Sequence, residues 1–263
     1  MKKVGLSTSS VYPESTAVAF ELASSLGFDG VEVMVGIDDM SQDLATLQAL
    51  QQYYGVPVLS IHAPCLLVTQ CVWGTDPWGK LKRAKTVAEA LGAQTVVVHP
   101  PFRWQRSYAR DFDEGLARLA EESEVRFAVE NMFPWRVGIE LDGYAPDWDP
   151  RNLEYPHVTL DLSHTAAARI DAVRMVADLG SRLQHVHLAD GSGSARDEHL
   201  IPGRGSEPLA EVLARVSGLD ISGSVIAEVS TRAAGSRQKR VEDLRQTLDF
   251  ARAHLDSSNP GSK

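Results

Sequence analysis

The sequence is poor in the features that mark several large classes of protein. Its 263 residues include only two cysteines, Cys65 and Cys71, so it has no disulfide framework and fits a reducing compartment. No run of about 18 apolar residues occurs, and we therefore expect no membrane-spanning helix. The opening MKKVGLSTSSVYPES is too polar for the core of a signal peptide, which favours a cytoplasmic protein.

Positive charge is also scarce. Lysine and arginine number 26 against 35 acidic residues, and the net charge is -9. An acidic chain has no bulk electrostatic attraction to nucleic acid, so this partner is disfavoured, although a local basic groove would still permit it.

The hydrophobic fraction of 43% is large enough to build a substantial core. No domain linker or low-complexity tract interrupts the chain. We expect a single domain over residues 1–255 and a disordered C-terminal tail, DSSNPGSK, at 256–263.

Short β-branched runs alternate with longer amphipathic segments along the chain. The expected strands are 3–9, 30–35, 58–63, 95–100, 126–131, 157–162, 184–189 and 224–229. These runs are apolar on both faces, as parallel strands buried on both sides are. The expected helices are 14–27, 41–55 with Ser41 as its cap, 76–92, 109–122, 167–179, 206–216 and 237–255.

Eight strand–helix units predict an α/β fold, a (β/α)8 TIM barrel. A doubly wound open sheet is the main competitor, but it would usually carry a Gly-rich phosphate turn after its first strand, and STSSVYPES has none. Residues 132–156 break the alternation, since they lack a helical pattern and are rich in Pro, Trp and Asp. We expect an ordered, functional loop there, over one mouth of the barrel.

Histidines and carboxylates gather where the expected strands end. The loop after the seventh strand adds two more, Asp197 and His199. The nine candidate metal ligands are His62, His99, Glu130, Asp161, His164, His187, Asp197, His199 and Glu228. The carboxyl ends of barrel strands meet at one face, so these side chains are expected to converge. A single histidine is more often hydrogen-bonded filler, and Asp161 alone could simply cap a helix. The inference of a metal site therefore rests on the occurrence of all nine residues together.

The donor chemistry indicates which ions would bind. Imidazoles and carboxylates without thiolates suit Zn, Mn or Fe better than Mg or Ca, and Zn or Mn is the expectation. One ion takes about four to six ligands, so nine fit two or three ions with bridging carboxylates. A single ion, with the remaining histidines contacting substrate, is the alternative. We therefore expect one to three divalent ions.

Seven segments occur in an order that resembles a known family. They are IHAP, VVVHPP, VENM, LDLSH, VHLAD, DEHLIPGRG and IAEVS. Together they resemble the xylose isomerase-like TIM barrels, from about residue 4 to 250. That superfamily includes sugar phosphate isomerases and epimerases, inosose dehydratases and the abasic-site nuclease endonuclease IV.

The resemblance implies two different ligand sets. In the isomerase branch it implies one ion held by Glu130, Asp161, His187 and Glu228, with the two glutamates as the acid/base pair. In the endonuclease IV branch it implies three zinc ions on all nine residues. The chain departs from the nuclease in HAPCLLVTQ and at Leu162, where a small hydroxyl residue is typical.

Other side chains are candidates for substrate contacts. Arg103 and Trp135 lie among aromatics and arginines that suit a sugar face with a phosphate, although solvated arginines beside packing aromatics are as plausible. Asp190 follows the seventh strand and is a third candidate. Glu32 is expected to face the barrel, where it would orient a ligand or pair with a buried cation.

Three functions follow. The preferred hypothesis is a divalent-metal-dependent isomerase or epimerase of a small sugar, sugar phosphate or polyol-type substrate, acting by proton abstraction and an enediolate. Its partner would be a small-molecule carbohydrate. The alternative is an endonuclease IV-like phosphodiesterase acting on abasic-site DNA. The third is a non-catalytic binding protein on an inherited barrel.

Overall fold

Eight parallel strands pair in a closed ring in the order β1-β10-β9-β8-β5-β4-β3-β2. The computed structural model describes residues 2–137 and 139–256. The strands are β1 (Val4–Ser7), β2 (Gly30–Met34), β3 (Val58–His62), β4 (Thr95–Val98), β5 (Arg126–Glu130), β8 (Val158–Asp161), β9 (Leu183–Leu188) and β10 (Val225–Ala227). Because β1 pairs with both β2 and β10, the sheet has no edge, and the expected (β/α)8 barrel is confirmed.

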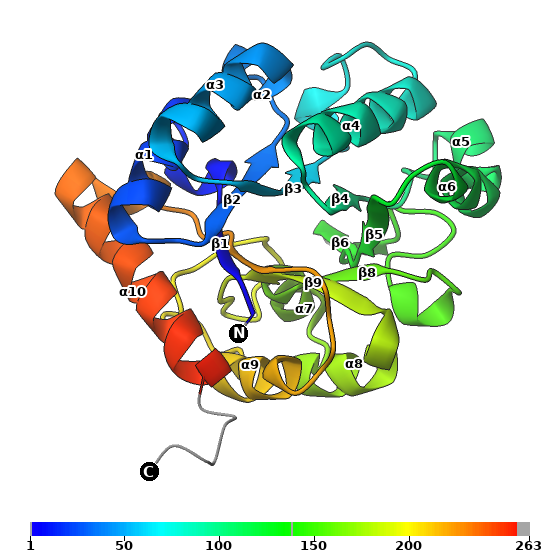
Figure 1. The fold of residues 1–263 in the computed structure, drawn as a ribbon. Helices are drawn as coiled ribbons and strands as arrows, with labels where there is room; N and C mark the ends of the chain where they lie inside the picture. Colours follow the sequence, from blue (N-terminus) through cyan, green and yellow to red (C-terminus); the bar gives the residue numbers. More distant parts are fainter. Residues whose placement is uncertain (1, 138, 257–263) are drawn as a thin grey trace.

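The helices form an outer ring around the strands, except that α7 lies inside this ring near the end of the barrel (Figure 1). They are α1 (Thr16–Leu26), α2 (Asp39–Gln42), α3 (Leu44–Tyr54), α4 (Pro77–Leu91), α5 (Arg106–Arg110), α6 (Phe112–Glu121), α7 (Leu162–Ala168), α8 (Ala172–Leu179), α9 (Leu209–Ser217) and α10 (Arg237–Asp256). None of the helices in the described ranges is long and apolar enough to cross a membrane. Asp256 is the last residue of α10, and the rest of the expected tail lies outside the described residues.

Three of the expected helices are divided in two, and the capping prediction at Ser41 is wrong. Asp43 has an extended backbone and its carboxylate accepts the N–H of Thr46, so a new helix, α3, begins there. Ser41 lies inside α2, where its hydroxyl donates to the Asp38 carbonyl. In the same way the expected helix 109–122 is interrupted at Asp111, between α5 and α6.

The third divided helix starts earlier than the pattern predicts. Asp161 ends β8 and its carboxylate accepts the N–H of His164 at 2.7 Å, so α7 begins directly after it. The break before α8 falls at Arg169, whose φ of 59° is left-handed. This cap places His164 on the first turn of a helix that rises from the barrel rim.

The long segment after β5 contains a hairpin that the sequence pattern did not predict. Strands β6 (Trp135–Val137) and β7 (Ile139–Leu141) pair antiparallel, and the segment then packs on the loop after β4. There Phe102 bridges to Tyr144, and both are buried with Met132. The segment is therefore anchored by its own aromatic cluster at the carboxyl end of the barrel.

Side chains alternate between the helix layer and the barrel interior. In β2, Val31 and Val33 belong to the apolar core, and Glu32 between them is equally buried. Ser60 of β3 and His185 of β9 are also fully buried. The expectation that Glu32 faces the barrel fits this position. Polar groups inside the barrel need partners, and these lead towards the site.

Candidate metal centre

The structure brings all nine candidate ligands to the carboxyl ends of the strands. His62, Glu130 and Asp161 end their strands, His99 and Glu228 follow theirs directly, and His187 is the penultimate residue of β9. These six residues are at most 6% exposed. Such burial of acidic and imidazole groups demands compensation by charge or hydrogen bonds.

The first ligand group is formed by His62, His99 and Glu130. Glu130 Oε2 lies 3.2 Å from His62 Nε2 and 3.0 Å from His99 Nε2. The two imidazole nitrogens are 3.2 Å apart. One carboxylate oxygen and two nitrogens therefore converge closely enough to share one ion.

The second group surrounds His187 Nδ1. That nitrogen lies 2.7 Å from Glu228 Oε2, 3.1 Å from Glu130 Oε1 and 3.5 Å from Asp161 Oδ2. Glu228 Oε2 and Asp161 Oδ2 are buried and have no hydrogen-bond partner. Two orphaned oxygens directed at one nitrogen fit a divalent ion well, because an ion would satisfy all of them.

The third group is built on Asp197. Its Oδ2 lies 3.3 Å from His164 Nε2 and 3.0 Å from His199 Nε2. Asp161 also lies within reach of both imidazoles. Since Glu130 contributes one oxygen to the first group and the other to the second, and Asp161 reaches the second and the third, the three groups are continuous.

Backbone carbonyls set the tautomers of three histidines. The Nδ1 atoms of His62, His164 and His199 lie 3.0, 2.8 and 2.7 Å from the carbonyl oxygens of Ala63, Asn131 and Glu228. A carbonyl only accepts, so each Nδ1 carries the proton in the neutral ring and each Nε2 lone pair faces the cluster. This is the state in which imidazole binds a metal.

Ser163 is a site residue that sequence reasoning missed. Its hydroxyl donates to Asp197 Oδ1 at 2.6 Å and accepts the N–H of His199 at 2.9 Å. His199 has a φ of 45°, a left-handed conformation that is uncommon for non-glycine residues. Ser163 thus ties the loop after β9 to α7, and its position in LDLSH was the only sequence signal.

In the metal-free site, the carboxylates shift the pKa values of neighbouring histidines. Burial alone would lower the pKa of every imidazole, and it does lower that of His99. Asp161 and Asp197 overcome burial and raise the pKa of His164 to about 10. The surrounding carboxylates likewise raise the pKa of His187 well above its ordinary value. The cluster therefore attracts positive charge, which protons supply when metal is absent.

A cavity of about 310 Å³ opens above the cluster. Glu130 and Glu228 line it, whereas Asp161 and His187 lie beneath, fully buried. Tyr12 and Leu66 contribute an apolar part of the rim. A small substrate in this cavity would meet the two glutamates directly.

The three residues expected to contact substrate have other partners. Arg103 pairs with Asp142, and Trp135 packs in the aromatic cluster with Phe102. Both carboxylate oxygens of Asp190 accept backbone N–H groups of the loop after β9. Of these three described side chains none lines the 310 Å³ cavity. Their positions support packing and loop anchoring instead.

Arg232, which the sequence reasoning did not single out, does line the cavity. It follows β10, and its guanidinium lies 5.4 Å from the centre of the Tyr12 ring. Among the described residues that line the cavity, it is the only lysine or arginine. No motif marks this position, because its role depends on the fold of the last loop.

The fold and this His/Asp/Glu cluster define a TIM barrel with a candidate metal centre at the carboxyl ends of its strands. The chain belongs to the xylose isomerase-like TIM barrel family, whose sequence profile matches residues 20–254. The resemblance seen in the sequence motifs is thereby confirmed.

The relatives differ in how similar their sequences are to this chain. The uncharacterized protein ML2432 of Mycobacterium leprae (strain TN) is 49% identical over 273 residues, which cover 96% of this chain and 98% of that protein. Fructoselysine 3-epimerase of Escherichia coli O157:H7 is 23% identical, over 81% of this chain and 85% of that one. The crystal structure of a D-tagatose 3-epimerase-like protein has a TM-score of 0.70 at 22% identity and covers 98% of each chain.

Proposed function

We propose that this protein is a divalent-metal-dependent epimerase or isomerase of a small sugar, sugar phosphate or polyol-type substrate. One observation carries the proposal. Glu130 and Glu228 both line the cavity, and both contact His187 Nδ1, at 3.1 and 2.7 Å. They come from β5 and β10, which are separated in the ring by β8 and β9.

The ligand chemistry supports one or more Zn or Mn ions. Glu130, Asp161 and His187, together with Glu228 beside His187, are the residues that would hold one of them. A divalent cation supplies Lewis-acid polarisation of a substrate carbonyl. Glu130 or Glu228 would take the proton from the carbon next to that carbonyl, leaving an enediolate. The other glutamate would return a proton to carbon, and return on the opposite face inverts its configuration.

The relatives support a carbohydrate substrate. Two of them bear the names of sugar epimerases, although at identities of 23% and 22%. We further propose that Arg232 binds an anionic group of the substrate, such as a phosphate. It is the one lysine or arginine among the described residues that line the cavity, and loops after the last barrel strands frequently bind phosphate.

The test is proton exchange with solvent. Metal-loaded protein is incubated in D2O with a panel of 2-ketohexoses and their phosphates, and deuterium at the carbon next to the carbonyl is measured by mass spectrometry and NMR. We expect incorporation into at least one compound and none with Glu130→Gln. Absence of label across the panel would contradict the proposal.

A second function is favoured by one observation. Glu130 directs each of its oxygens to a different imidazole group, and Asp197 builds a third group with His164 and His199. This matches the three-ion set implied by the resemblance to endonuclease IV. The reaction would then be hydrolysis of a phosphodiester at an abasic site.

Two measurements separate the candidates. Elemental analysis giving about one ion per chain supports the epimerase, whereas three zinc ions support the hydrolase. We expect no cleavage of abasic-site duplex and no salt-dependent duplex binding near 0.15 M salt, because the chain has a net charge of -9. Metal-dependent cleavage at an abasic site would establish the second function instead.

A further inference from the structure

We propose that Glu32 is a positioning residue, which holds His187 with its Nδ1 lone pair towards the metal centre. The inference rests on the proposed metal centre but concerns a carboxylate outside it. Glu32 belongs to β2, and no other part of the proposed mechanism uses it. It is nevertheless fully buried, so interactions with neighbouring groups must offset the free energy that its carboxylate loses on leaving water.

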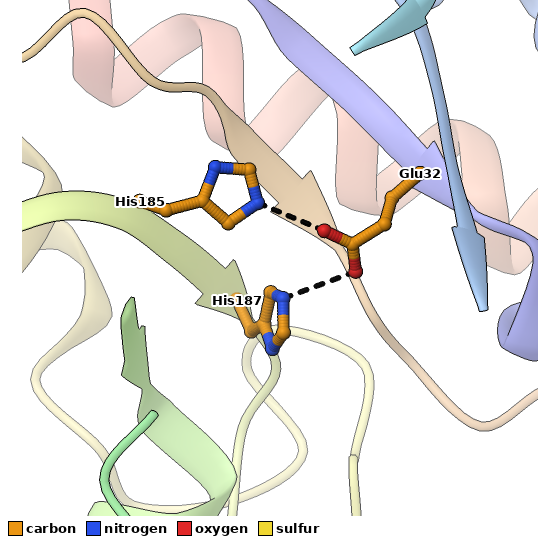
Figure 2. A group of neighbouring side chains, drawn as sticks. All are labelled: Glu32, His185 and His187. Atoms are coloured by element: carbon orange, nitrogen blue, oxygen red, sulfur yellow. Dashed lines mark hydrogen bonds and ion pairs between the residues drawn. The ribbon is translucent and has the colours of Figure 1, made fainter. Parts of the chain in front are cut away.

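Glu32 faces two histidines of β9, one at each oxygen of its carboxylate (Figure 2). Its Oε1 is 3.1 Å from His187 Nε2, and its Oε2 is 2.9 Å from His185 Nε2. Both imidazoles point towards the carboxylate from β9. In the barrel, β9 is separated from β2 by β1 and β10. The opposite edge of the His187 ring carries Nδ1, which faces Glu228 at 2.7 Å.

His187 differs from three other histidines of the cluster in what fixes its ring. His62, His164 and His199 each direct Nδ1 to a backbone carbonyl and Nε2 to the site. The ring of His187 has the opposite orientation. Its Nδ1 faces the site, and its Nε2 lies against the carboxylate of Glu32. His187 lies inside β9, whose backbone is engaged in pairing with β8 and β10, so a side chain must supply the acceptor.

The donors around Glu32 leave one assignment of protons. The Ser224 N–H donates to His185 Nδ1 at 3.3 Å, so neutral His185 carries its proton on Nε2 and donates it to Glu32. The Ser60 hydroxyl donates to the same oxygen, Oε2, at 2.7 Å. Neither Oε1 nor His187 Nε2 makes a hydrogen bond, and the two atoms form an ion pair at 3.1 Å, so a proton on Nε2 would face Oε1. A neutral His187 with its proton on Nε2 has its lone pair on Nδ1, towards the centre.

A carboxylate is required because donors meet both of its oxygens. In Glu32→Gln the amide has one acceptor oxygen and an NH2 group that only donates. If the NH2 faces His187, that ring must accept at Nε2 and carry its proton on Nδ1, where a metal would bind. If the NH2 faces His185, two donors oppose each other. Either arrangement disfavours the metal-binding tautomer or destabilises its support.

The first experiment measures zinc affinity by chelator competition. We expect Glu32→Gln to bind zinc about 10- to 100-fold more weakly than wild type, the range for loss of a group that orients a metal-bound histidine. Ser60→Ala is the matched control, since it removes a buried hydrogen bond to the same carboxylate but leaves the contact with His187. Its affinity should stay near the wild-type value. Equal affinity of Glu32→Gln and wild type would overturn the inference.

Two further measurements keep the inference testable if Glu32→Gln does not fold. Long-range ¹H–¹⁵N spectra of the zinc-loaded wild-type protein, with His187 assigned by its loss in His187→Gln, should show zinc on Nδ1 and the proton on Nε2. Zinc on Nε2 would overturn the inference. His185→Gln should keep the full number of ions, and loss of one would mean that Glu32, His185 and His187 hold an ion themselves.

Failure of the inference is distinguishable from failure of the proposed function. Wild-type protein that binds no metal removes the metal centre and the positioning role together. Wild-type protein that binds zinc, with a Glu32→Gln variant that binds it equally well, removes only the role of Glu32.

Discussion

Gly205 donates its backbone N–H to Asp190 Oδ2 at 2.9 Å and lies so close to this carboxylate that a Cβ atom on Gly205 would be 2.3 Å from Oδ1. The same carboxylate accepts the N–H groups of Gly191, Gly203 and Glu207. One buried aspartate therefore closes both ends of the loop that carries Asp197 and His199 to the cluster.

Substitution of Gly205 tests this closure. Gly205→Ala should push Asp190 away, destabilise the fold by about 1 to 3 kcal/mol as overpacking does, and weaken the ligand group that contains Asp197. Urea unfolding and zinc titration measure the two effects. Gly218→Ala is the control, because a Cβ there meets nothing closer than 3.5 Å. Equal stability and zinc affinity of the two variants would contradict the role of the loop.

Removal of either cavity-lining glutamate should stop turnover. Glu130→Gln and Glu228→Gln keep the volume of the side chain but lose its basicity, and each should lower kcat by about 10²- to 10⁴-fold on a substrate found by deuterium exchange. Glu211→Gln on the exposed face of α9 should leave kcat unchanged. A variant at Glu130 or Glu228 with wild-type kcat would exclude that residue from proton transfer.

Metal binding should release protons at neutral pH. Nearby carboxylates raise the pKa of His164 to about 10 and that of His187 well above its usual range, so we expect both rings to be protonated in the metal-free protein at pH 7. An ion binds only the neutral ring, so affinity should fall as the pH is lowered. Calorimetric titrations in two buffers of different ionisation enthalpy count the protons. A heat that is independent of the buffer would refute this expectation.

The role of Arg232 predicts a preference for phosphorylated substrates. Arg232→Gln should raise KM about tenfold for a sugar phosphate, since one charge-assisted contact at an exposed position is lost, and should leave KM for the neutral sugar unchanged. Arg103→Gln is the matched control, because Arg103 pairs with Asp142 away from the cavity. An equal rise in KM for both sugars would contradict a phosphate contact.

The strand-end rule explains why so much of the candidate site could be found in the sequence. Parallel strands fix the direction of the chain, so a residue such as Glu130, at the end of an apolar run, must emerge at the carboxyl face of the barrel. Six strands with such endings converge in any closed ring. The ligand roles of these residues remain predictions until metal is measured.

Residues in loops followed no such rule. The sequence placed Arg103 at the mouth but gave no sign that Asp142, 39 positions further on, would pair with it. The hydroxyl of Ser163 and the guanidinium of Arg232 reach the site through turns whose shape depends on contacts elsewhere. Helix boundaries also escaped prediction where an aspartate such as Asp43 competed with the helix as a cap.

The sequence by itself determined the barrel, since its order of buried strands and amphipathic helices has one closed solution, and it determined which face would carry imidazoles and carboxylates. The tertiary structure decided which nitrogen of each imidazole faces the cluster. That choice depends on acceptors from distant segments, such as Glu32 of β2 against His187 of β9. Hydrogen-bond geometry acts over about 3 Å, and no spacing along a chain can specify it until the strands have closed.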